Sequence, residues 1–475
     1  MRTLVWYRGK DLRLADHAPL AEAVRSARHE GGEVIPLFVL DEHFFRPEHA
    51  RRTPHRIQFL LDSIASLAAN LEHAGSRLIV VGGRSVEVVP HLARRWKVDR
   101  VLAQSWVAPV GRERDRRVAE RLQVPLELFD TETLCPPGSL RTGNGEPFSV
   151  FSAFARAFHR DVVVGTPLPA PRRLPALPDD VKTPGIALPS LESLGIGRQP
   201  RVLAGGERQA RTRLKEWLSG DAKDYDELRN RMDLPGTSRL SADLKFGTLS
   251  VRTVWRAVDR ALRELSPDAL RRYHDELLWR EFAHSTLFDR PTLPEQPFRA
   301  EWRNFPWRDD ERGWEAWVAG TTGYPVVDAA ARELLATGFV HNRARMIAAS
   351  FLAKHLLIDF RRGERHYMDL LTDGDWANND LGWQWSAGCG CDAQPWFRIF
   401  NPQTQGEKFD PDGAYVRRWV PELARLPARY IHAPQAAPAT VLVQAGIGKQ
   451  DYPTPIVEHA FARQRFIEIA RKHLG

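Results

Sequence analysis

The segment from residue 373 to residue 385 concentrates side chains that could do chemistry. It reads Asp373-Gly374-Asp375-Trp376-Ala377-Asn378-Asn379-Asp380-Leu381-Gly382-Trp383-Gln384-Trp385. Asp, Asn and Gly are poor helix formers, so their presence here is not explained by a need to form a helix. A calcium loop is excluded because no glutamate follows at the spacing of its bidentate ligand. The segment is therefore the most informative candidate for a functional site.

Two shorter motifs place polar groups at the start or on the face of a helix. Residues 236–241, Gly-Thr-Ser-Arg-Leu-Ser, bring three hydroxyls and an arginine ahead of a helical run. Such groups suit a phosphate or simply cap the helix. Glu276, Trp279 and Arg280 lie at i, i+3 and i+4 and share one helix face, either as part of a site or as a solvated ion pair.

A third motif lies on the helix that begins near Val340. Asn342, Arg345 and Met346 share one stripe of this helix, where apolar side chains would be expected. The stripe predicts either a helix that lines a cavity or a boundary helix with a snorkelling arginine.

The cysteines predict no further chemistry. Cys135, Cys389 and Cys391 are too few for a disulfide framework, which favours a reducing cytoplasm. Cys389 and Cys391 could suggest a metal, but no second cysteine or histidine pair lies nearby. We predict reduced structural thiols and no metal site.

The motifs follow an N-terminal region in which strand and helix signals alternate. Apolar runs at residues 4–7, 34–40, 78–81, 101–103 and 126–129 predict strands, and residues 56–74 have the spacing of an amphipathic helix. Strands separated by helices predict a doubly wound parallel sheet, which binds ligands at the carboxyl ends of its strands. No Gly-x-Gly-x-x-Gly or P-loop motif follows the first strand, which argues against dinucleotide or ATP binding there.

The remainder of the chain is mostly helical. Eight prolines between residues 167 and 200 predict an extended connector. Beyond it, helical spacing dominates at residues 206–219, 251–265, 268–286, 325–337, 340–361 and 457–473. We therefore predict an α/β domain at residues 1–131, an extended proline-rich interdomain connector at residues 132–204 and an all-α domain at residues 205–475.

Composition narrows the class of protein. The 475 residues include 68 Lys and Arg against 60 Asp and Glu, which gives a formal net charge of +8. A hydrophobic content of 43% excludes wholesale disorder, and no apolar run is long enough to span a bilayer. Charged residues directly after the first apolar stretch exclude a signal peptide. The 15 tryptophans on this basic chain are compatible with stacking on nucleic-acid bases or with a large helical core.

Six blocks resemble, in order, the signature blocks of the photolyase/cryptochrome family. They are Thr237-Ser238-Arg239-Leu240-Ser241, Trp279-Arg280-Glu281-Phe282, Gly323-Tyr324-Pro325-Val326-Val327-Asp328, His341-Asn342-Arg343-Ala344-Arg345-Met346, Trp383-Gln384-Trp385 and Phe397-Arg398-Ile399-Phe400-Asn401-Pro402. Residues 6–14 resemble the family's opening strand and turn. The resemblance covers nearly the whole chain and points to the bacterial class I cyclobutane pyrimidine dimer photolyases.

The resemblance implies an α/β antenna domain and a helical domain that binds FAD. Thr237, Ser238, Leu240 and Ser241, with Tyr225, would hold the FAD phosphates. Arg345 and Asp373 would pair over the flavin ring, and Asp375 would bond its pyrimidine edge. Asn379 would face the reactive ring nitrogen and favour reduced flavin. The full set assigned to FAD is Tyr225, Thr237, Ser238, Arg239, Leu240, Ser241, Arg280, Asn342, Arg345, Asp373, Asp375 and Asn379.

The implied reaction is the repair of cyclobutane pyrimidine dimers in ultraviolet-damaged DNA. Excited reduced FAD would pass an electron to the flipped-out lesion, the ring would split, and the electron would return. Glu276 and Asn342 would hydrogen-bond the dimer. Met346, Trp279 and Trp385 would form apolar walls around it. Arg229, Arg343 and Arg398 are candidates for contacts with flanking phosphates.

The resemblance also bears on the subfamily. Photolyases for six-four photoproducts are expected to carry histidines at the positions of Asn342 and Met346, so cyclobutane dimers are the expected substrate. A tailless cryptochrome-type blue-light photoreceptor is the alternative, because a fold alone does not fix function. A second antenna chromophore, a folate or a deazaflavin, is left open, and Gly111-Arg112 replaces the acidic residue associated with a folate. We expect a cytoplasmic monomer that does not bind membranes.

Two positions depart from the family's pattern. The family relays electrons to the flavin through three tryptophans, of which Trp383 would be nearest the flavin and Trp307 outermost. Phe360 occupies the middle position, which predicts slower photoreduction or a detour through Trp376, Tyr367 or Trp396. Tyr273 stands where the family often has a tryptophan lining the dimer pocket.

Overall fold

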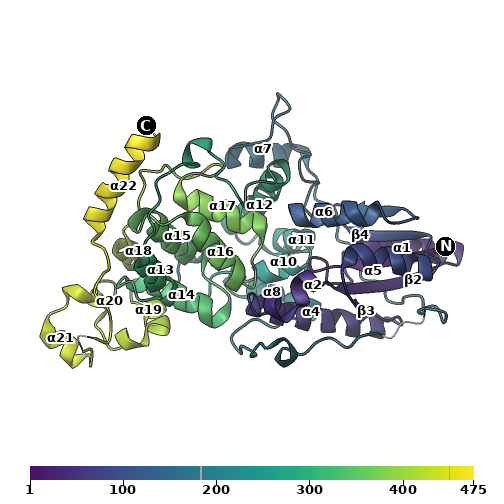
Figure 1. Ribbon diagram of the computed structural model, residues 1–475, viewed down its shortest axis with the longest axis horizontal. Helices are drawn as coiled ribbons and strands as arrows, with labels where there is room; N and C mark the ends of the chain where they lie inside the picture. Colours follow the sequence, from purple (N-terminus) through teal and green to yellow (C-terminus); the bar gives the residue numbers. More distant parts are fainter. Residues whose placement is uncertain (182–184, 449, 475) are drawn as a thin grey trace. The chain divides into compact units, whose positions relative to one another are not determined.

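The computed structural model describes residues 1–181, 185–448 and 450–474 (Figure 1). The chain divides into two compact units, neither of which is continuous in sequence. The first unit contains Met1–Lys223, Ser238–Pro291 and Thr372–Ala377. The second contains Asp224–Thr237, Thr292–Leu371 and the residues from Asn378 onward. The three-domain division at residues 131 and 204 stays a prediction.

A five-stranded parallel sheet forms the N-terminal part of the first unit. Its strands are β1 (Arg2–Tyr7), β2 (Glu33–Leu40), β3 (Ile79–Gly82), β4 (Arg100–Gln104) and β5 (Leu126–Phe129), in the order β3-β2-β1-β4-β5. Successive side chains of β1 enter opposite cores: Val5 and Tyr7 lie in one cluster, Leu4 and Trp6 in the other. Burial on both faces explains why β1 and β2 are apolar beyond their first residues, whereas the edge strand β5 is partly exposed and contains Glu127. The predicted doubly wound parallel sheet is confirmed.

Helices cover both faces of this sheet. Their bounds are α1 (Ala18–Glu30), α2 (Glu42–Phe45), α3 (Pro47–Ala50), α4 (Pro54–His73), α5 (Ser85–Arg95) and α6 (Pro109–Ala119). Ile57 and Ile64 of α4 join the cluster of Val5, whereas Val89 of α5 joins that of Leu4. The helix predicted at residues 56–74 is therefore present as α4.

Further helices complete the first unit. They are α7 (Phe151–Asp161), the 3-10 turn η1 (Glu192–Leu194), α8 (Glu207–Ser219), α10 (Ser241–Phe246), α11 (Val251–Leu262) and α12 (Pro267–Asp289). The 3-10 turn η2 (Asp221–Asp224) ends at the first residue of the second unit. Helix α7 lies inside residues 132–204, which were predicted to be extended. Its Phe154 and Phe158 are buried, and the Phe154 ring lies 5.4 Å from that of Phe282 on α12. The prolines that suggested an extended chain begin only after α7.

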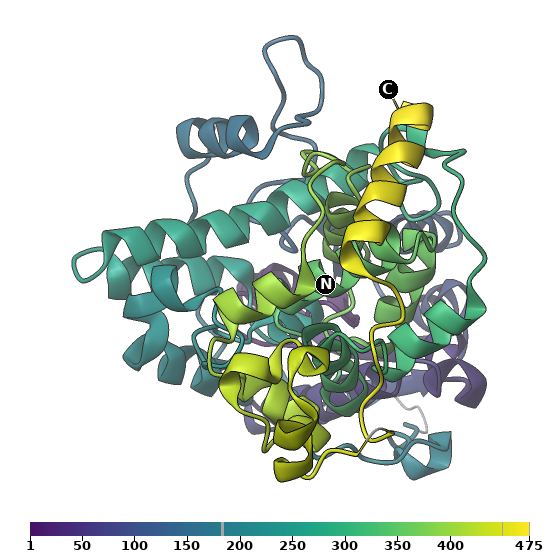
Figure 2. The same ribbon diagram turned by 90° about the vertical axis from the view of Figure 1, so that its left-hand side faces the viewer.

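The second unit is helical, as predicted. Its elements are α9 (Tyr225–Leu228), η3 (Ala300–Trp302), α13 (Glu311–Ala319), α14 (Pro325–Thr337), α15 (Asn342–Ser350), the π-helical turn η4 (Phe351–His355), α16 (Phe360–Leu370), α18 (Pro402–Phe409), α19 (Ala414–Trp419), η5 (Pro421–Leu423), α20 (Ala428–Ile431), η6 (Pro434–Ala436), α21 (Ala439–Gln444) and α22 (His459–Leu474). Helix α17 (Trp376–Ala387) begins in the first unit and continues into the second. The C-terminal helix α22, yellow in Figure 2, packs against η4.

The helical spacing predicted over residues 340–361 does not give one continuous helix, because α15 runs into η4 and the chain then breaks before α16. Leu357 has a left-handed backbone with φ +58°, which ends the helical path after η4. The Asp359 side chain then accepts a hydrogen bond from the Arg361 backbone N–H, a capping contact that starts α16. None of the helices that the structure describes is long and apolar enough to cross a membrane.

Candidate functional site

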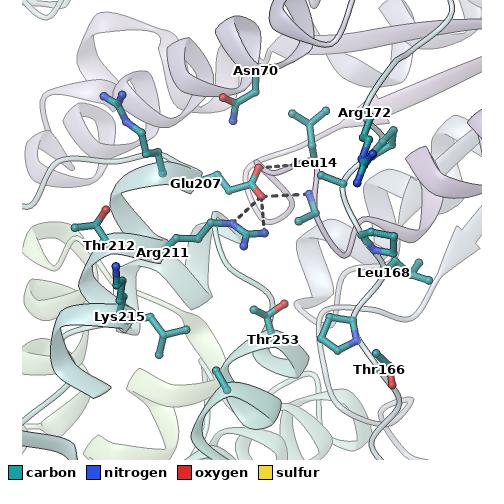
Figure 3. A pocket seen from close by; sticks show the side chains of 18 of the residues that line it. Leu14, Asn70, Thr166, Leu168, Arg172, Glu207, Arg211, Thr212, Lys215 and Thr253 are labelled. Carbon is teal, nitrogen blue, oxygen red and sulfur yellow. Dashed lines mark hydrogen bonds and ion pairs between the residues drawn. The ribbon is translucent and has the colours of Figure 1, made fainter. Parts of the chain in front are cut away.

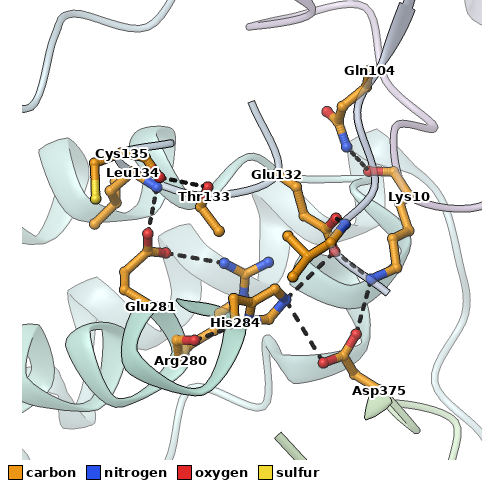
Figure 4. A network of polar contacts seen from close by, with 11 residues as sticks. Lys10, Gln104, Glu132, Thr133, Leu134, Cys135, Arg280, Glu281, His284 and Asp375 are labelled. Atoms are coloured by element: carbon orange, nitrogen blue, oxygen red, sulfur yellow. Dashed lines mark hydrogen bonds and ion pairs between the residues drawn. The ribbon is translucent and has the colours of Figure 1, made fainter. Parts of the chain in front are cut away.

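Asp375 is held in the first unit by a buried polar network (Figure 4). The Lys10 ammonium lies 3.0 Å from Asp375 Oδ2 and also contacts the Glu132 carboxylate. His284 Nε2 lies 3.4 Å from Glu132 and 3.7 Å from Asp375. Glu132, His284 and Asp375 are close enough to one another to hold a metal ion, but the Lys10 ammonium contacts both carboxylates.

The Lys10 charge decides the ionisation of this network. Burial alone would raise the pKa of Asp375, but the Lys10 ammonium holds that pKa well below its usual value. Burial opposes ionisation of Glu132 as well, yet Lys10 and His284 lower its pKa to about 2. Asp375 is therefore a buried carboxylate at neutral pH, able to accept a hydrogen bond from an N–H group.

The loop after β1 is placed by a close backbone approach to the end of α10. Arg13 Nη1 donates to the carbonyl oxygen of Gly247 at 3.0 Å, and Leu12 N donates to Phe246 O at 3.2 Å. Gly247 has φ +62°, and a Cβ there would collide with the carbonyl group of Lys10. Glycine at this position therefore lets Lys10 lie where it contacts Asp375.

Arg280 of α12 lies in the same region of the first unit (Figure 4). Its Nη1 lies 3.1 Å from Glu281 Oε1, and Glu281 Oε2 accepts the Leu134 backbone N–H at 2.7 Å. Burial raises the pKa of Glu281, which the Arg280 charge opposes. The proposed contact of Arg280 with FAD stays a prediction.

The hydroxyl-rich motif leads into α10 through an unusual backbone. Arg239 has φ +52°, and Leu240, directly before the helix, has φ −88° and ψ 2°. The Tyr273 hydroxyl donates to Ser238 Oγ at 2.9 Å. Leu240 is apolar and does not cap the helix with its side chain, so the plain capping explanation does not apply to it. Phosphate binding by this loop stays a prediction.

Trp279 of α12 forms a flat aromatic surface with a residue of α7. Its indole stacks on the Phe151 ring with the ring centroids 3.9 Å apart and an interplanar angle of 6°. Glu276 lies one helical turn before Trp279 and is half-buried. The structure thus keeps the acid and the indole on one side of α12, as their spacing predicted.

Helix α15 carries the motif of residues 341–346 in the second unit. The His341 side chain caps the helix by accepting from the Arg343 N–H. Asn342 is exposed, and its amide nitrogen lies 3.8 Å from Met346 Sδ, so both side chains follow one stripe. Arg345 Nε donates to the carbonyl oxygen of Val340 at 2.7 Å.

The three arginines predicted to contact DNA phosphates lie in the second unit, and the structure shows what each one contacts. Arg343 Nη2 donates to Asn230 Oδ1 at 2.5 Å, and its guanidinium lies over the Phe409 ring. Arg229 lies 5.9 Å from the Tyr225 ring centroid. Arg398 is exposed, and its backbone oxygen accepts a hydrogen bond from the buried Lys354 at 2.9 Å.

Asn379 is buried on α17 and oriented by one hydrogen bond. Its amide nitrogen donates to the Glu364 backbone oxygen at 3.1 Å. The hydrogen bond fixes the orientation of the amide, whose oxygen is an acceptor suited to an N–H group of a ligand. Asp380, the next residue, is buried, and burial raises its pKa to about 7.

Trp383 has aromatic neighbours other than Phe360. The Tyr367 ring centroid lies 5.2 Å from that of Trp383 and the Trp317 centroid 6.0 Å from it. Trp317 in turn stacks on the half-buried Trp314 with centroids 5.5 Å apart. The Trp307 and Phe360 centroids are 6.2 Å apart.

The predicted site residues are divided between the two units. The first unit contains Ser238, Arg239, Leu240, Ser241, Glu276, Trp279, Arg280, Asp373 and Asp375. The second unit contains Tyr225, Arg229, Thr237, Trp307, Asn342, Arg343, Arg345, Met346, Asn379, Trp383, Trp385 and Arg398. Arg345 lies in the second unit and Asp373 in the first, so their pairing stays a prediction. Sequence reasoning missed Lys10, Glu132 and His284. The position of Lys10, just after the carboxyl end of β1, was the available signal.

Two of the predicted residues fit FAD by their hydrogen-bonding chemistry. Asp375 is an ionised acceptor suited to the N–H of the flavin's pyrimidine edge. The amide oxygen of Asn379 suits the N–H that a reduced flavin carries at its reactive ring nitrogen.

Comparisons with known proteins cover almost the whole chain. The family model described as DNA photolyase matches residues 3–172, and the model described as FAD binding domain of DNA photolyase matches residues 273–472. The chain is 39% identical to the deoxyribodipyrimidine photo-lyase of Agrobacterium fabrum, over 97% of this chain and 96% of that protein. It is 37% identical to the Escherichia coli protein of the same name, over 99% of both chains.

Solved structures agree with these relatives. A bacterial class III photolyase from Agrobacterium tumefaciens superposes with a TM-score of 0.90 at 37% identity, covering 99% of this chain and 97% of the other. A Synechocystis cryptochrome superposes with a TM-score of 0.90 at 32% identity, covering 99% of both. The chain belongs to the photolyase/cryptochrome family.

Proposed function

We propose that this protein is a deoxyribodipyrimidine photo-lyase that uses light and FAD to repair cyclobutane pyrimidine dimers in DNA. The observation that carries the proposal is the full-length similarity to relatives of that name, at 39% and 37% identity. The similarity to a cryptochrome shows that the fold alone does not separate repair from signalling. Asn342 and Met346, which share a stripe of α15, support the repair of cyclobutane dimers rather than six-four photoproducts.

FAD supplies the light absorption and the electron that the repair needs. The residues that would hold its phosphates are Ser238, Ser241 and Thr237, with Tyr225, and Arg239 and Arg280 would add contacts. Asp375 would accept the N–H of the pyrimidine edge, because Lys10 keeps this carboxylate ionised. The amide oxygen of Asn379 would stabilise the protonated ring nitrogen of the reduced flavin.

The protein's own part in repair is to bind and orient the flipped-out dimer. Glu276 and Asn342 would donate to or accept from its carbonyl and N–H groups. Trp279, stacked on Phe151, offers a rigid flat surface on which a base can lie. Met346 and Trp385 would complete the apolar walls, which exclude water from the lesion.

DNA on either side of the lesion would be held through its phosphates. Arg229, Arg343 and Arg398 supply the positive charges, so binding would weaken as the salt concentration rises. We further propose that the protein acts in the cytoplasm, which its low number of three cysteines supports, and that it acts as a monomer.

A second chromophore, a folate or a deazaflavin, is part of the proposal without a choice between them. A cavity of about 340 Å³ in the first unit, lined by Trp106, Arg112 and Phe288 among others, is one place where a planar ring could bind. The Arg112 guanidinium lies 4.2 Å from the Phe288 ring centroid.

The proposal is tested by mixing the flavin-loaded protein with an oligonucleotide that contains one thymine dimer. We expect dimers to disappear under blue light and to persist in the dark. Glu276→Ala should slow the light-driven loss, whereas Glu315→Ala, an exposed acid on α13, should not. Bound flavin without any light-dependent dimer loss would contradict the enzyme function and favour a photoreceptor.

A further inference from the structure

A groove of about 1320 Å³ crosses the first unit, bounded by α8, α11 and the proline-rich residues 166–172 (Figure 3). None of its lining residues is assigned above to FAD, the dimer or DNA. The volume exceeds the roughly 300–1,000 Å³ of a small-molecule pocket, and the groove is open to solvent. Its dimensions suit an extended chain.

The rim of the groove carries five cations, of which only Arg211 has an ion-pair partner among the described residues. Its cationic lining residues are Arg172, Arg208, Arg211, Lys215 and Arg260. Glu207 is the one carboxylate in the lining; it is buried, accepts the Leu14 N–H at 2.8 Å and pairs with Arg211 at 3.2 Å. In the described parts of the chain, no carboxylate forms an ion pair with the other four cations. An anionic ligand is therefore favoured.

The spacing of these cations matches a polymer. Arg208, Arg211 and Lys215 lie at i, i+3 and i+7 on α8 and follow one face of that helix. Seven residues of helix span about 10 Å, the length of about three residues of extended chain. A ligand that runs along α8 would meet one cation after another.

The floor of the groove is aliphatic. Ala15, Leu214, Leu218 and Ala257 line it, together with prolines of the 166–172 segment. The lining contains no phenylalanine, tyrosine or tryptophan, and its one ring is the imidazole of the exposed His73. Nucleic-acid bases therefore have little surface on which to stack. A surface of this kind suits leucine, isoleucine or valine side chains.

The wall formed by the proline-rich segment is already in place. Asp16 N donates to Leu168 O at 2.8 Å, and Leu168 N donates to Asp16 Oδ1 at 2.9 Å. Prolines at positions 167, 169 and 171 restrict the backbone on both sides of Leu168. A ligand would bind without first ordering this wall, which lowers the entropy cost of binding.

We propose that this groove binds an acidic segment of a partner protein, in which Asp or Glu residues alternate with aliphatic residues. Successive side chains of an extended peptide point to opposite sides. The aliphatic side chains would then face the floor while the carboxylates reach the arginines and the lysine of the rim. This function is separate from dimer repair.

The test uses the full-length protein and a fluorescein-labelled peptide of alternating Glu and Leu, with binding followed by fluorescence anisotropy. We expect binding by the wild-type protein, and binding weakened by about tenfold or more in Arg208→Glu/Lys215→Glu. The matched control, Arg471→Glu/Lys472→Glu, changes the charge equally on exposed residues of α22 and should bind as the wild type does. Both variants should keep the wild-type rate of dimer repair.

Thr212→Glu, an exposed position between Arg208 and Lys215, is a second variant that should also weaken binding if the double variant does not fold. Unchanged affinity in the groove variants would overturn the proposal. Equal binding of a peptide of alternating Glu and Ser would also overturn it, because the aliphatic floor would then have no role. Displacement of the labelled peptide by undamaged duplex DNA, with loss of DNA affinity in the double variant, would identify a nucleic-acid surface instead.

Discussion

Asn379 illustrates how one hydrogen bond can prepare a side chain for a ligand. Its amide nitrogen donates to the Glu364 backbone oxygen, which leaves the amide oxygen as the acceptor. A reduced flavin has an N–H at the reactive ring nitrogen, and an oxidised flavin has a bare acceptor there. With the amide oxygen facing that nitrogen, as we propose, Asn379 would favour the reduced form that repair requires.

Asn379→Leu is expected to destabilise the reduced flavin, because leucine cannot accept its N–H. The variant, loaded with FAD and reduced, should reoxidise in air faster than the wild type. Absorbance spectroscopy follows the change. Asn378→Leu, at the exposed neighbouring position, is the control. Equal reoxidation rates of the wild type and Asn379→Leu would show that the amide has no such role.

We propose that Trp317 carries electrons in place of the tryptophan that the resemblance leads us to expect at position 360. It lies against Trp383 and stacks on the half-buried Trp314, so these rings lead from a buried position toward the surface. We expect Trp317→Phe to slow flavin photoreduction several-fold in transient absorption. The Trp396 ring contacts Phe397, whose ring is not easily oxidised and cannot pass the electron on. Trp396→Phe should therefore have little effect on photoreduction. If only Tyr367→Phe slows the reaction, the electron passes through the tyrosine instead.

Among the elements, the loop after β1 has the clearest structural role. Lys10 in this loop neutralises two buried carboxylates, Glu132 and Asp375. Removing one partner of a buried ion pair leaves an uncompensated charge, so Lys10→Met should lower the free energy of unfolding at pH 7 by about 3–5 kcal/mol. Urea unfolding measures this loss, and Lys472→Met, at an exposed position of α22, is the control.

The same variant gives a pH test. Without Lys10, burial raises the pKa of both carboxyls above their unfolded values, so the folded state takes up protons as the pH falls. The destabilisation of Lys10→Met should therefore shrink between pH 7 and pH about 5. A deficit that stays constant over this range would mean that the carboxylates are not desolvated.

The π-helical turn η4 positions the loop that carries Arg398. Lys354 is fully buried in this turn and donates to the Arg398 backbone oxygen. Burial lowers the pKa of Lys354 to about 7, below its unfolded value of about 10.4. Between these two pKa values, Lys354 is protonated in the unfolded chain and neutral in the folded protein. The free energy of unfolding therefore rises with pH, by up to about 1.4 kcal/mol per pH unit.

Lys354→Met is expected to remove that rise. Urea unfolding at about pH 7.5 and about pH 9, both within the window of roughly 7–10.4, measures the free energy of unfolding. The difference between the two values should be smaller in the variant than in the wild type. The loss of the contact with Arg398 should also weaken binding to DNA. An identical pH dependence in both proteins would show that Lys354 stays protonated when buried.

The sequence predicts helices and strands better than it predicts contacts between residues that are far apart in the chain. The central strands were recognisable because burial on both faces makes them apolar, and α4 because of its periodic leucines and isoleucines. The break at Leu357 was not recognisable, since the apolar spacing continues through it. Lys10 and Asp375 are 365 positions apart, and nothing local in the sequence joins them. Helix α7 could have been found from the spacing of Phe151, Phe154 and Phe158.

On the scale of the whole molecule, the formal charge of +8 is modest for a DNA-binding protein. Its effect depends on where the cations lie, and Arg398 is exposed on a loop of the second unit. Affinity for dimer-containing DNA should fall as salt rises, and Arg398→Ala should reduce the slope of that dependence by about one phosphate contact. Fluorescence anisotropy over a range of salt concentrations measures both. An unchanged slope would remove Arg398 from the DNA-binding surface.

The central claim is that light absorbed by a bound flavin drives the loss of pyrimidine dimers. The most direct test is an action spectrum, in which the rate of dimer loss from a defined oligonucleotide is measured at successive wavelengths. We predict that the rate follows the absorption of the bound chromophores, falls to zero in the dark and disappears when FAD is removed. Dimer loss that is independent of wavelength or continues in the dark, or no loss at any wavelength absorbed by the flavin, would contradict the claim.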